Sequence, residues 1–215
     1  MTAILFDLDG TLLDTLQDLT DATNAALTHF GYPVRTLEEV RRFVGNGAKN
    51  QITLSMPHGE SPEQIEKVLD WYKTYYAAHS QIKTRPYDGV LEALEEVKQE
   101  FPVAVVSNKP DVAVKILCSQ YFGDVFALGE SSDCPRKPAP DMVYKAMEAV
   151  GADRCVYVGD SEVDVLTARN AGVPCLSVLW GFRDKATLEE AGATHFCDHP
   201  ADILISLKEM TDYGK

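Results

Sequence analysis

The sequence has little positive charge and no clustered cysteines. Lys and Arg number 20 against 33 Asp and Glu, which gives a formal net charge of −13 at pH 7. So acidic a chain repels a phosphate backbone at long range, and we therefore expect no binding of nucleic acid. The cysteines are widely spaced and include no C-x-x-C pair, so neither a disulfide framework nor a zinc site is indicated. They are Cys118, Cys134, Cys155, Cys175 and Cys197.

Long apolar runs are also missing. No segment approaches the ~20 consecutive apolar residues that a membrane-spanning helix needs. The apolar residues 3–6 are interrupted at once by Asp7, and no basic region precedes them, so we expect no signal peptide. With thiols expected to be reduced, these observations favour a soluble cytoplasmic protein that does not bind membranes. The 45% of hydrophobic residues is enough for a sizeable core and argues against a disordered chain.

Short apolar runs alternate with amphipathic segments along most of the chain. Continuous apolar runs are typical of strands that helices cover on both faces, as in a parallel sheet. The runs are 3–6, 103–106, 125–128, 156–158 and 175–179. The amphipathic segments are 89–100, 111–121, 141–150 and 164–171. This alternation predicts an α/β domain with a doubly wound, Rossmann-like parallel sheet.

The alternation is interrupted between the first and second runs. Apolar residues there recur at helical spacing over about 16–30, 37–44 and 65–76, and Asp14 and Thr15 are placed to cap the first helix. A segment of this length is too long for an ordinary strand-to-helix connection. We therefore predict a helical cap domain over 15–83, inserted into a core domain of 1–14 and 84–215.

Polar side chains follow the predicted strands or precede the helices that come next. In open α/β sheets, ligands bind at the carboxyl ends of strands, near a topological switch point. The residues in question are Asp7, Asp9, Thr11, Ser107, Asn108, Lys137, Asp160 and Asp164. Each has a simpler explanation on its own, such as a helix cap for Asp160 or a turn for Ser107 and Asn108. Their joint occurrence, each after the appropriate element, favours a shared site.

The carboxylates in this group favour a bound cation. Asp7 and Asp160, with Asp9 and Asp164 as further candidates, would repel one another if nothing neutralised them. Oxygen ligands without His or Cys nearby are the set that Mg²⁺ prefers.

The remaining polar groups favour an anionic substrate. Lys137 and the metal would attract an anion, and Ser107 with the backbone N–H groups after it would suit phosphate oxygens. An aspartate can act as a nucleophile through an aspartyl-phosphate. A second carboxyl beside it can protonate the leaving alcohol and later activate water.

Four motifs resemble those of the haloacid dehalogenase-like phosphohydrolases, in the order of that family. They are DLDGT at 7–11, SN at 107–108, KPAP at 137–140 and GDSEVD at 159–164. The resemblance implies that Asp7 attacks phosphorus and that Asp9 is the general acid and base. It also implies that Ser107 and Asn108 hold the phosphoryl group, with Thr11 counted among the substrate-binding residues. Lys137 would offset charge on the phosphoryl group and orient Asp7.

The same resemblance implies a Mg²⁺ site. Its ligands would be Asp7, the backbone carbonyl of Asp9 and Asp160, with Asp164 as a direct or outer ligand. The presence of Asp9 matters because the dehalogenases of the superfamily lack this second acid.

Further segments look most like the phosphoglycolate phosphatase branch. They are FVGNG at 43–47, PYDG at 86–89, SNKP at 107–110 and Gly181 in LWG at 179–181. We expect Gly45, Asn46 and Gly47 to form a turn between two cap helices where the backbone can approach a small substrate. Lys49 and Arg42 could then meet a carboxylate of the substrate, or could simply be solvated cations.

Three functions are therefore weighed. The first is a Mg²⁺-dependent phosphomonoesterase acting on a small phosphorylated metabolite such as 2-phosphoglycolate, as a monomer or homodimer. The second is a phosphomutase of the β-phosphoglucomutase type, which shares the core and has a similar cap. The third is a phospho-receiver signalling domain, which the large helical insert and the second aspartate at position 9 argue against.

Overall fold

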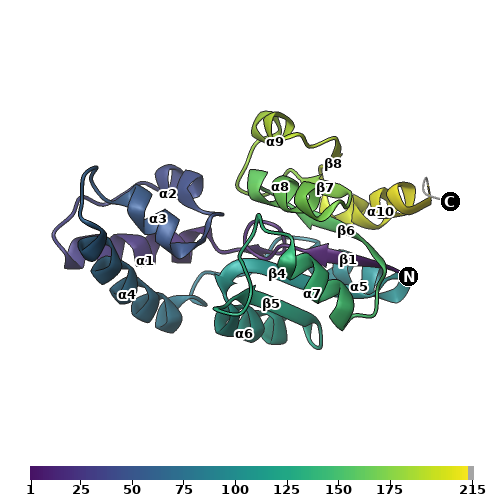
Figure 1. Cartoon of the computed structure of the whole chain (residues 1–215), viewed down its shortest axis with the longest axis horizontal. Coiled ribbons are helices and arrows are strands. Elements are labelled where there is room, and N and C mark those ends of the chain that lie inside the picture. Colours follow the sequence, from purple (N-terminus) through teal and green to yellow (C-terminus); the bar gives the residue numbers. More distant parts are fainter. Residues whose placement is uncertain (213–215) are drawn as a thin grey trace. The chain divides into compact units, whose positions relative to one another are not determined.

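The computed structural model describes residues 1–212, and the chain forms two compact units (Figure 1). One consists of Met1–Leu13 together with the chain from Pro86 onward, and the other is Asp14–Arg85. The boundaries expected from the sequence, after residues 14 and 83, differ from these by one and two residues. Two short strands that pair with each other, β2 (Leu13–Asp14) and β3 (Arg85–Pro86), lie where the chain passes between the units.

The first unit is built on a six-stranded sheet in the order β5-β4-β1-β6-β7-β8, and every neighbouring pair is parallel. The prediction of a parallel α/β sheet is confirmed. The strands are β1 (Thr2–Phe6), β4 (Val103–Pro110), β5 (Phe126–Glu130), β6 (Arg154–Gly159), β7 (Cys175–Val178) and β8 (His195–Cys197). The order runs one way from β1 to β5 and the other way from β6 to β8, so the topological switch point lies between β1 and β6.

Alternate residues of β1 point to opposite faces of the sheet, and helices cover both faces. Ile4 and Phe6 pack with α5 (Val90–Glu100), α6 (Asp111–Phe122) and α10 (Ile203–Asp212) in one apolar cluster. Ala3 and Leu5 pack with α7 (Asp141–Ala149) and α8 (Glu162–Ala171) in another. This two-sided burial explains why the strands appear in the sequence as continuous apolar runs.

The short elements β8 and α9 (Lys185–Ala191) in the last part of this unit were not predicted. β8 has only three residues and begins with the exposed His195, so it offers no apolar run. The helix α9 is short and buries only Leu188. After a 3₁₀ turn, η1 (Pro200–Asp202), α10 closes the described chain. None of these elements carries the long periodic pattern on which the prediction depended.

Within residues 14–85, all of which the structure describes, there are four helices. They are α1 (Leu16–His29), α2 (Leu37–Phe43), α3 (Gly47–Ser55) and α4 (Pro62–His79). The sequence predicted three, and α3 was missed because Gly47 begins it and only Gln51, Ile52 and Ser55 are buried. The turn expected at 45–47 lies between two helices, but it is one residue shorter than expected because Gly47 is the first residue of α3.

Two expectations for this unit need correction. Thr15 is at the N-cap position of α1, but its buried hydroxyl makes no hydrogen bond within residues 1–212, so its side chain does not cap the helix. The backbone N–H of Leu16 donates to Asp14 Oδ1 instead, at 3.3 Å. Over 65–76, where apolar residues at helical spacing were expected to be buried, Tyr72 and Tyr76 of α4 are buried, whereas Tyr75 is only half-buried and stacks between Trp71 and His79.

The cysteine thiols are unpaired, as their wide spacing in the sequence predicted. All five cysteines are free thiols. Burial raises the pKa of the thiols of Cys118, Cys155 and Cys175 to about 12, so these thiols stay protonated and unreactive at neutral pH. Over residues 1–212, none of the helices combines the length and the apolar character required to cross a membrane.

Candidate active site

Asp7 lies directly after β1, at the switch point of the sheet. Its backbone N–H donates to Val158 of β6 at 2.8 Å, which ties the end of β1 to the neighbouring strand. The side chain turns back so that Oδ1 accepts from the backbone N–H of Leu8 at 2.7 Å. The chain then bends sharply at Gly10, whose φ is +90°. A Cβ at Gly10 would lie 2.3 Å from Asp160 Oδ2, so only glycine fits beside this carboxylate.

Lys137 joins Asp7 to the residues after β6. Its Nζ lies 2.9 Å from Asp7 Oδ1, 2.8 Å from Asp164 Oδ1 and 3.0 Å from the hydroxyl of Tyr157. The side chain of Lys137 is only 2% exposed. Burial lowers the pKa of this ammonium, but the carboxylates of Asp164 and Asp7 outweigh burial and hold the pKa well above its ordinary value. Lys137 therefore remains a cation at the centre of the site.

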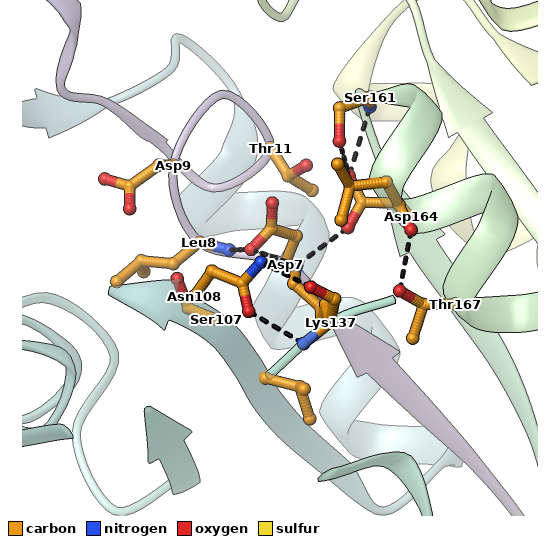
Figure 2. Close-up of polar contacts among 12 residues, drawn as sticks. Asp7, Leu8, Asp9, Thr11, Ser107, Asn108, Lys137, Ser161, Asp164 and Thr167 are labelled. Carbon is orange, nitrogen blue, oxygen red and sulfur yellow. Dashed lines mark hydrogen bonds and ion pairs between the residues drawn. The ribbon is translucent and has the colours of Figure 1, made fainter. Parts of the chain in front are cut away.

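Asn108 fixes the backbone around Lys137. Its side-chain Oδ1 accepts from the Lys137 N–H at 2.8 Å, and its Nδ2 donates to the Lys137 carbonyl at 3.0 Å (Figure 2). The sequence did not indicate this role. The neighbouring Ser107 is buried within the second half of β4, and its Oγ accepts from the backbone N–H of Lys109 at 3.2 Å.

Three buried carboxylates cluster at this point. Among residues 1–212, Asp7, Asp160 and Asp164 place one oxygen each within 4.8 Å of one another. Burial and the charge of Asp164 raise the pKa of Asp7 well above its ordinary value. The same two causes raise the pKa of Asp160 to about 7. The cluster is therefore electrostatically unfavourable without an added cation.

The other contacts of Asp160 and Asp164 fix their orientation. Thr11 Oγ1 donates to Asp160 Oδ1 at 2.9 Å, and the backbone N–H of Phe182 donates to Oδ2 at 2.7 Å. Asp164 accepts from the N–H and the hydroxyl of Ser161 through Oδ2, at 3.1 and 2.6 Å. Because Oδ1 of Asp164 also faces Lys137, this carboxylate is engaged on both sides within the protein. The hydroxyl of Thr11, which the resemblance counts among the substrate-binding residues, thus supports Asp160 in this structure.

Asp9 lies outside this cluster. Its side chain points away from Asp7 and Asp164 in Figure 2, and its Oδ1 accepts from Lys109 Nζ at 2.7 Å. Lys109 itself is buried. Lys109 belongs to the SNKP segment, and no role for its side chain was predicted from the sequence. Its position two residues after Ser107, at the carboxyl end of the same strand, was the signal that could have identified it.

Four of the expected substrate-binding residues belong to the other compact unit. Gly45 and Asn46 form the turn before α3, with Asn46 at the N-cap position and Gly47 as the first helical residue. Lys49 in α3 is exposed and forms an ion pair with Glu66 of α4. The structure thus gives Lys49 a partner within its own unit.

The residues present suit a divalent cation of the hard type. The clustered donors are three carboxylates and include no His or Cys, which matches the oxygen ligands of Mg²⁺. Bringing a cation to Asp7 and Asp160 would also relieve the repulsion that raises their pKa values.

Comparison with known proteins places this geometry in a family. Residues 4–178 match the family model described as haloacid dehalogenase-like hydrolase. The chain belongs to the haloacid dehalogenase-like hydrolase family. The assignment made from the four sequence motifs is confirmed, and the protein is an enzyme, a phosphatase of this family.

Several relatives are similar over most of their length. A phosphoglycolate phosphatase of Xanthomonas campestris pv. campestris is 34% identical over 187 residues, which cover 84% of each chain. One of Vibrio parahaemolyticus is 33% identical over 215 residues, covering 94% of this chain and 93% of the relative. The solved structure of a protein from Lactobacillus delbrueckii subsp. bulgaricus has a TM-score of 0.91 and 38% identity, covering 95% and 97% of the two chains.

Proposed function

We propose that the protein is a Mg²⁺-dependent phosphomonoesterase that acts through an aspartyl-phosphate on a small phosphorylated metabolite, with 2-phosphoglycolate as the first candidate. The observation that carries the proposal is the pairing of Asp7 with the buried Lys137 at the switch point, 2.9 Å apart, beside the carboxylates of Asp160 and Asp164. A nucleophilic carboxylate, a fixed cation and metal-binding oxygens are the groups that phosphoryl transfer requires.

Asp7 is assigned as the nucleophile. Its Oδ1 is held by the Leu8 N–H and by Lys137, which fixes the plane of the carboxylate and the direction from which it meets phosphorus. Attack by Asp7 forms an O–P bond and breaks the bond between phosphorus and the alcohol oxygen of the substrate. Lys137 and the side chain of Ser107 are placed to stabilise the charge on the phosphoryl oxygens.

The metal would be held by Asp7 and Asp160, with the backbone carbonyl of Asp9 as a further ligand. When bound, Mg²⁺ neutralises the phosphoryl group and the clustered carboxylates, which leaves phosphorus open to an anionic nucleophile. We assign Asp164 to the outer shell, because its two oxygens already contact Lys137 and Ser161. In that position it holds Lys137 against Asp7.

Asp9 is assigned as the general acid and base. It gives a proton to the departing alcohol oxygen and later takes a proton from the water that hydrolyses the aspartyl-phosphate. In this structure Lys109 Nζ donates to Oδ1 of Asp9 at 2.7 Å. We assign the proton transfers to Oδ2 of Asp9, which would take up a proton from solvent before the alcohol leaves, while Lys109 keeps Oδ1 in place.

The cap unit is proposed to select the leaving group. The backbone at Gly45, Asn46 and Gly47 is suited to approach a small ligand, and Lys49 offers a cation for its carboxylate. Because Lys49 pairs with Glu66, a substrate carboxylate would have to compete with that side chain. The names of the relatives support 2-phosphoglycolate, which carries such a carboxylate. The free thiols support a cytoplasmic location.

The test is a phosphate-release screen with purified protein. We expect hydrolysis of small phosphomonoesters, 2-phosphoglycolate among the best, with activity lost in EDTA and restored by Mg²⁺. Asp7→Asn should abolish release, whereas Asp124→Asn, the same change at an exposed position of the same unit, should not. Sugar-phosphate isomerisation without net phosphate release would show a phosphomutase instead. A stable phosphoprotein without turnover of any ester would exclude an esterase.

A further inference from the structure

Three hydrogen bonds link the loop after β7, the turn after β1 and Asp160. Trp180 Nε1 donates to the backbone carbonyl of Thr11 at 3.0 Å. Thr11 Oγ1 donates in turn to Asp160 Oδ1 at 2.9 Å. The backbone N–H of Phe182 donates to Asp160 Oδ2 at 2.7 Å. Both oxygens of Asp160 are therefore fixed by residues that the loop supplies directly or holds in place.

Gly181 lets the loop come this close. A Cβ at this position would lie 2.3 Å from Asp160 Cβ and 2.4 Å from the carbonyl oxygen of Gly10. Both separations are far shorter than van der Waals contact, and both neighbours belong to the proposed site. The glycine of the LWG segment is thus required by packing against Asp160.

We propose that Trp180 is a positioning residue for the metal ligand Asp160, acting through Thr11. The indole N–H fixes the Thr11 carbonyl, and this fixes the direction of the hydroxyl that holds Asp160 Oδ1. The inference rests on the proposed function, because it assigns Asp160 as a ligand of Mg²⁺. When a residue that hydrogen-bonds to a metal ligand is removed, the affinity for the metal commonly falls 10–100-fold.

A purely structural role for Trp180 is the competing explanation. Its side chain is half-buried and packs against the apolar cluster beneath α5 and α6. Trp180→Phe retains an aromatic ring for this packing but removes the N–H that reaches Thr11. If Trp180 serves packing alone, this substitution changes stability and leaves the affinity for Mg²⁺ unchanged.

The experiment measures Mg²⁺ binding by calorimetry in the absence of substrate. The chain has two tryptophans, so Trp71→Phe in α4 is a matched control. We expect Trp71→Phe to bind Mg²⁺ like the wild type and Trp180→Phe to bind it about tenfold more weakly. Thr11→Val, which replaces the hydroxyl by a methyl group, should weaken binding by a similar factor. Adding Trp180→Phe to Thr11→Val should weaken it little further, because both act on one hydrogen bond.

Two results overturn the role proposed for Trp180 and leave the proposed function intact. One is equal Mg²⁺ affinity for Trp180→Phe and Trp71→Phe. The other is a double variant whose loss of Mg²⁺ affinity equals the product of the losses caused by Thr11→Val and Trp180→Phe. A wild-type protein that binds no Mg²⁺ and releases phosphate in EDTA overturns the proposed metal site and the inference with it. Circular dichroism of each variant confirms that the compared proteins are folded. Weaker binding by Trp180→Phe together with a non-additive double variant supports the inference.

Discussion

Lys109 Nζ lies 2.7 Å from Asp9 Oδ1, and the side chains of the two residues are 3% and 14% exposed. Two residues earlier, Asp7 is paired in the same way with Lys137. The two aspartates of the DLD segment thus have separate lysines and separate surroundings, one within the acidic cluster and the other outside it. This separation gives a physical basis for assigning them different chemical tasks.

Lys109→Met tests whether Lys109 acts through Asp9. Without the ammonium, the Asp9 carboxylate loses the ion pair that holds its Oδ1, so we expect kcat to fall by about tenfold or more with little change in KM. The loss should stay within the 10²–10⁴-fold range of a general acid–base group. Steady-state phosphate release measures both constants.

The controls for Lys109 are a double variant and a surface lysine. If Lys109 acts only through Asp9, Asp9→Asn with Lys109→Met should be no slower than Asp9→Asn alone. Lys115→Met removes an exposed lysine that pairs with Asp111, and should leave kcat unchanged. Full additivity in the double variant would show that Lys109 has a role independent of Asp9.

The stability of the metal-free protein should fall as pH rises. Burial and Asp164 raise the pKa of Asp160 to about 7 and also raise that of Asp7. Between about pH 4 and 7 the folded protein therefore binds more protons than the unfolded chain, so the free energy of unfolding decreases with increasing pH. The slope is at most about 1.4 kcal/mol per pH unit for each group.

Urea unfolding in EDTA between pH 5.5 and 8 measures this slope. Saturating Mg²⁺ should flatten it, because the cation favours the ionised carboxylates and binds the folded state. Asp160→Asn should remove part of the slope in EDTA. Stability that rises with pH in EDTA would contradict the proposed repulsion within the cluster.

Tyr157 should contribute to stability through its hydroxyl. The buried O–H donates to the Val106 carbonyl at 3.2 Å, and the oxygen accepts from Lys137. Tyr157→Phe leaves both partners with one fewer hydrogen bond, and we expect it to lower the free energy of unfolding by about 1–3 kcal/mol. Tyr144→Phe is the control, since that exposed hydroxyl donates to Ala171 at 3.4 Å and should contribute little. Urea denaturation compares them, and equal effects would deny Tyr157 this role.

Gly10→Ala separates backbone strain from crowding of the site. Gly10 and Gly59 both have positive φ, +90° and +93°, but nothing lies within 4 Å of a Cβ built at Gly59. Gly59→Ala should cost about 1–2 kcal/mol of stability and leave phosphate release unchanged. Gly10→Ala should in addition displace Asp160 and reduce kcat by roughly 10–100-fold, the range found when a metal-site partner is lost. Similar activity for the two variants would mean that Asp160 tolerates the added methyl group.

The sequence predicted the positions of strands and site residues where these depend on the local pattern of apolar and polar residues. The apolar runs of β1, β4 and β6 identified the sheet, and the polar residues after them identified Asp7, Ser107 and Asp160. The sequence did not indicate contacts made across the sheet, such as Asn108 with the Lys137 backbone or Trp180 with Thr11. These depend on which strands are neighbours, and the strand order is not encoded in any local pattern. Short elements such as β8 and α3 were missed for a different reason: they bury too few residues for their apolar positions to show a period in the sequence.

The residues proposed for catalysis, Asp7, Lys137 and Asp160, come from distant parts of the chain. They lie close together because β1 pairs with both β4 and β6. A truncated product that ends before β6 retains the nucleophile and its lysine but lacks Asp160. Nascent chains of this enzyme should therefore remain inert during synthesis until the final third has emerged and docked.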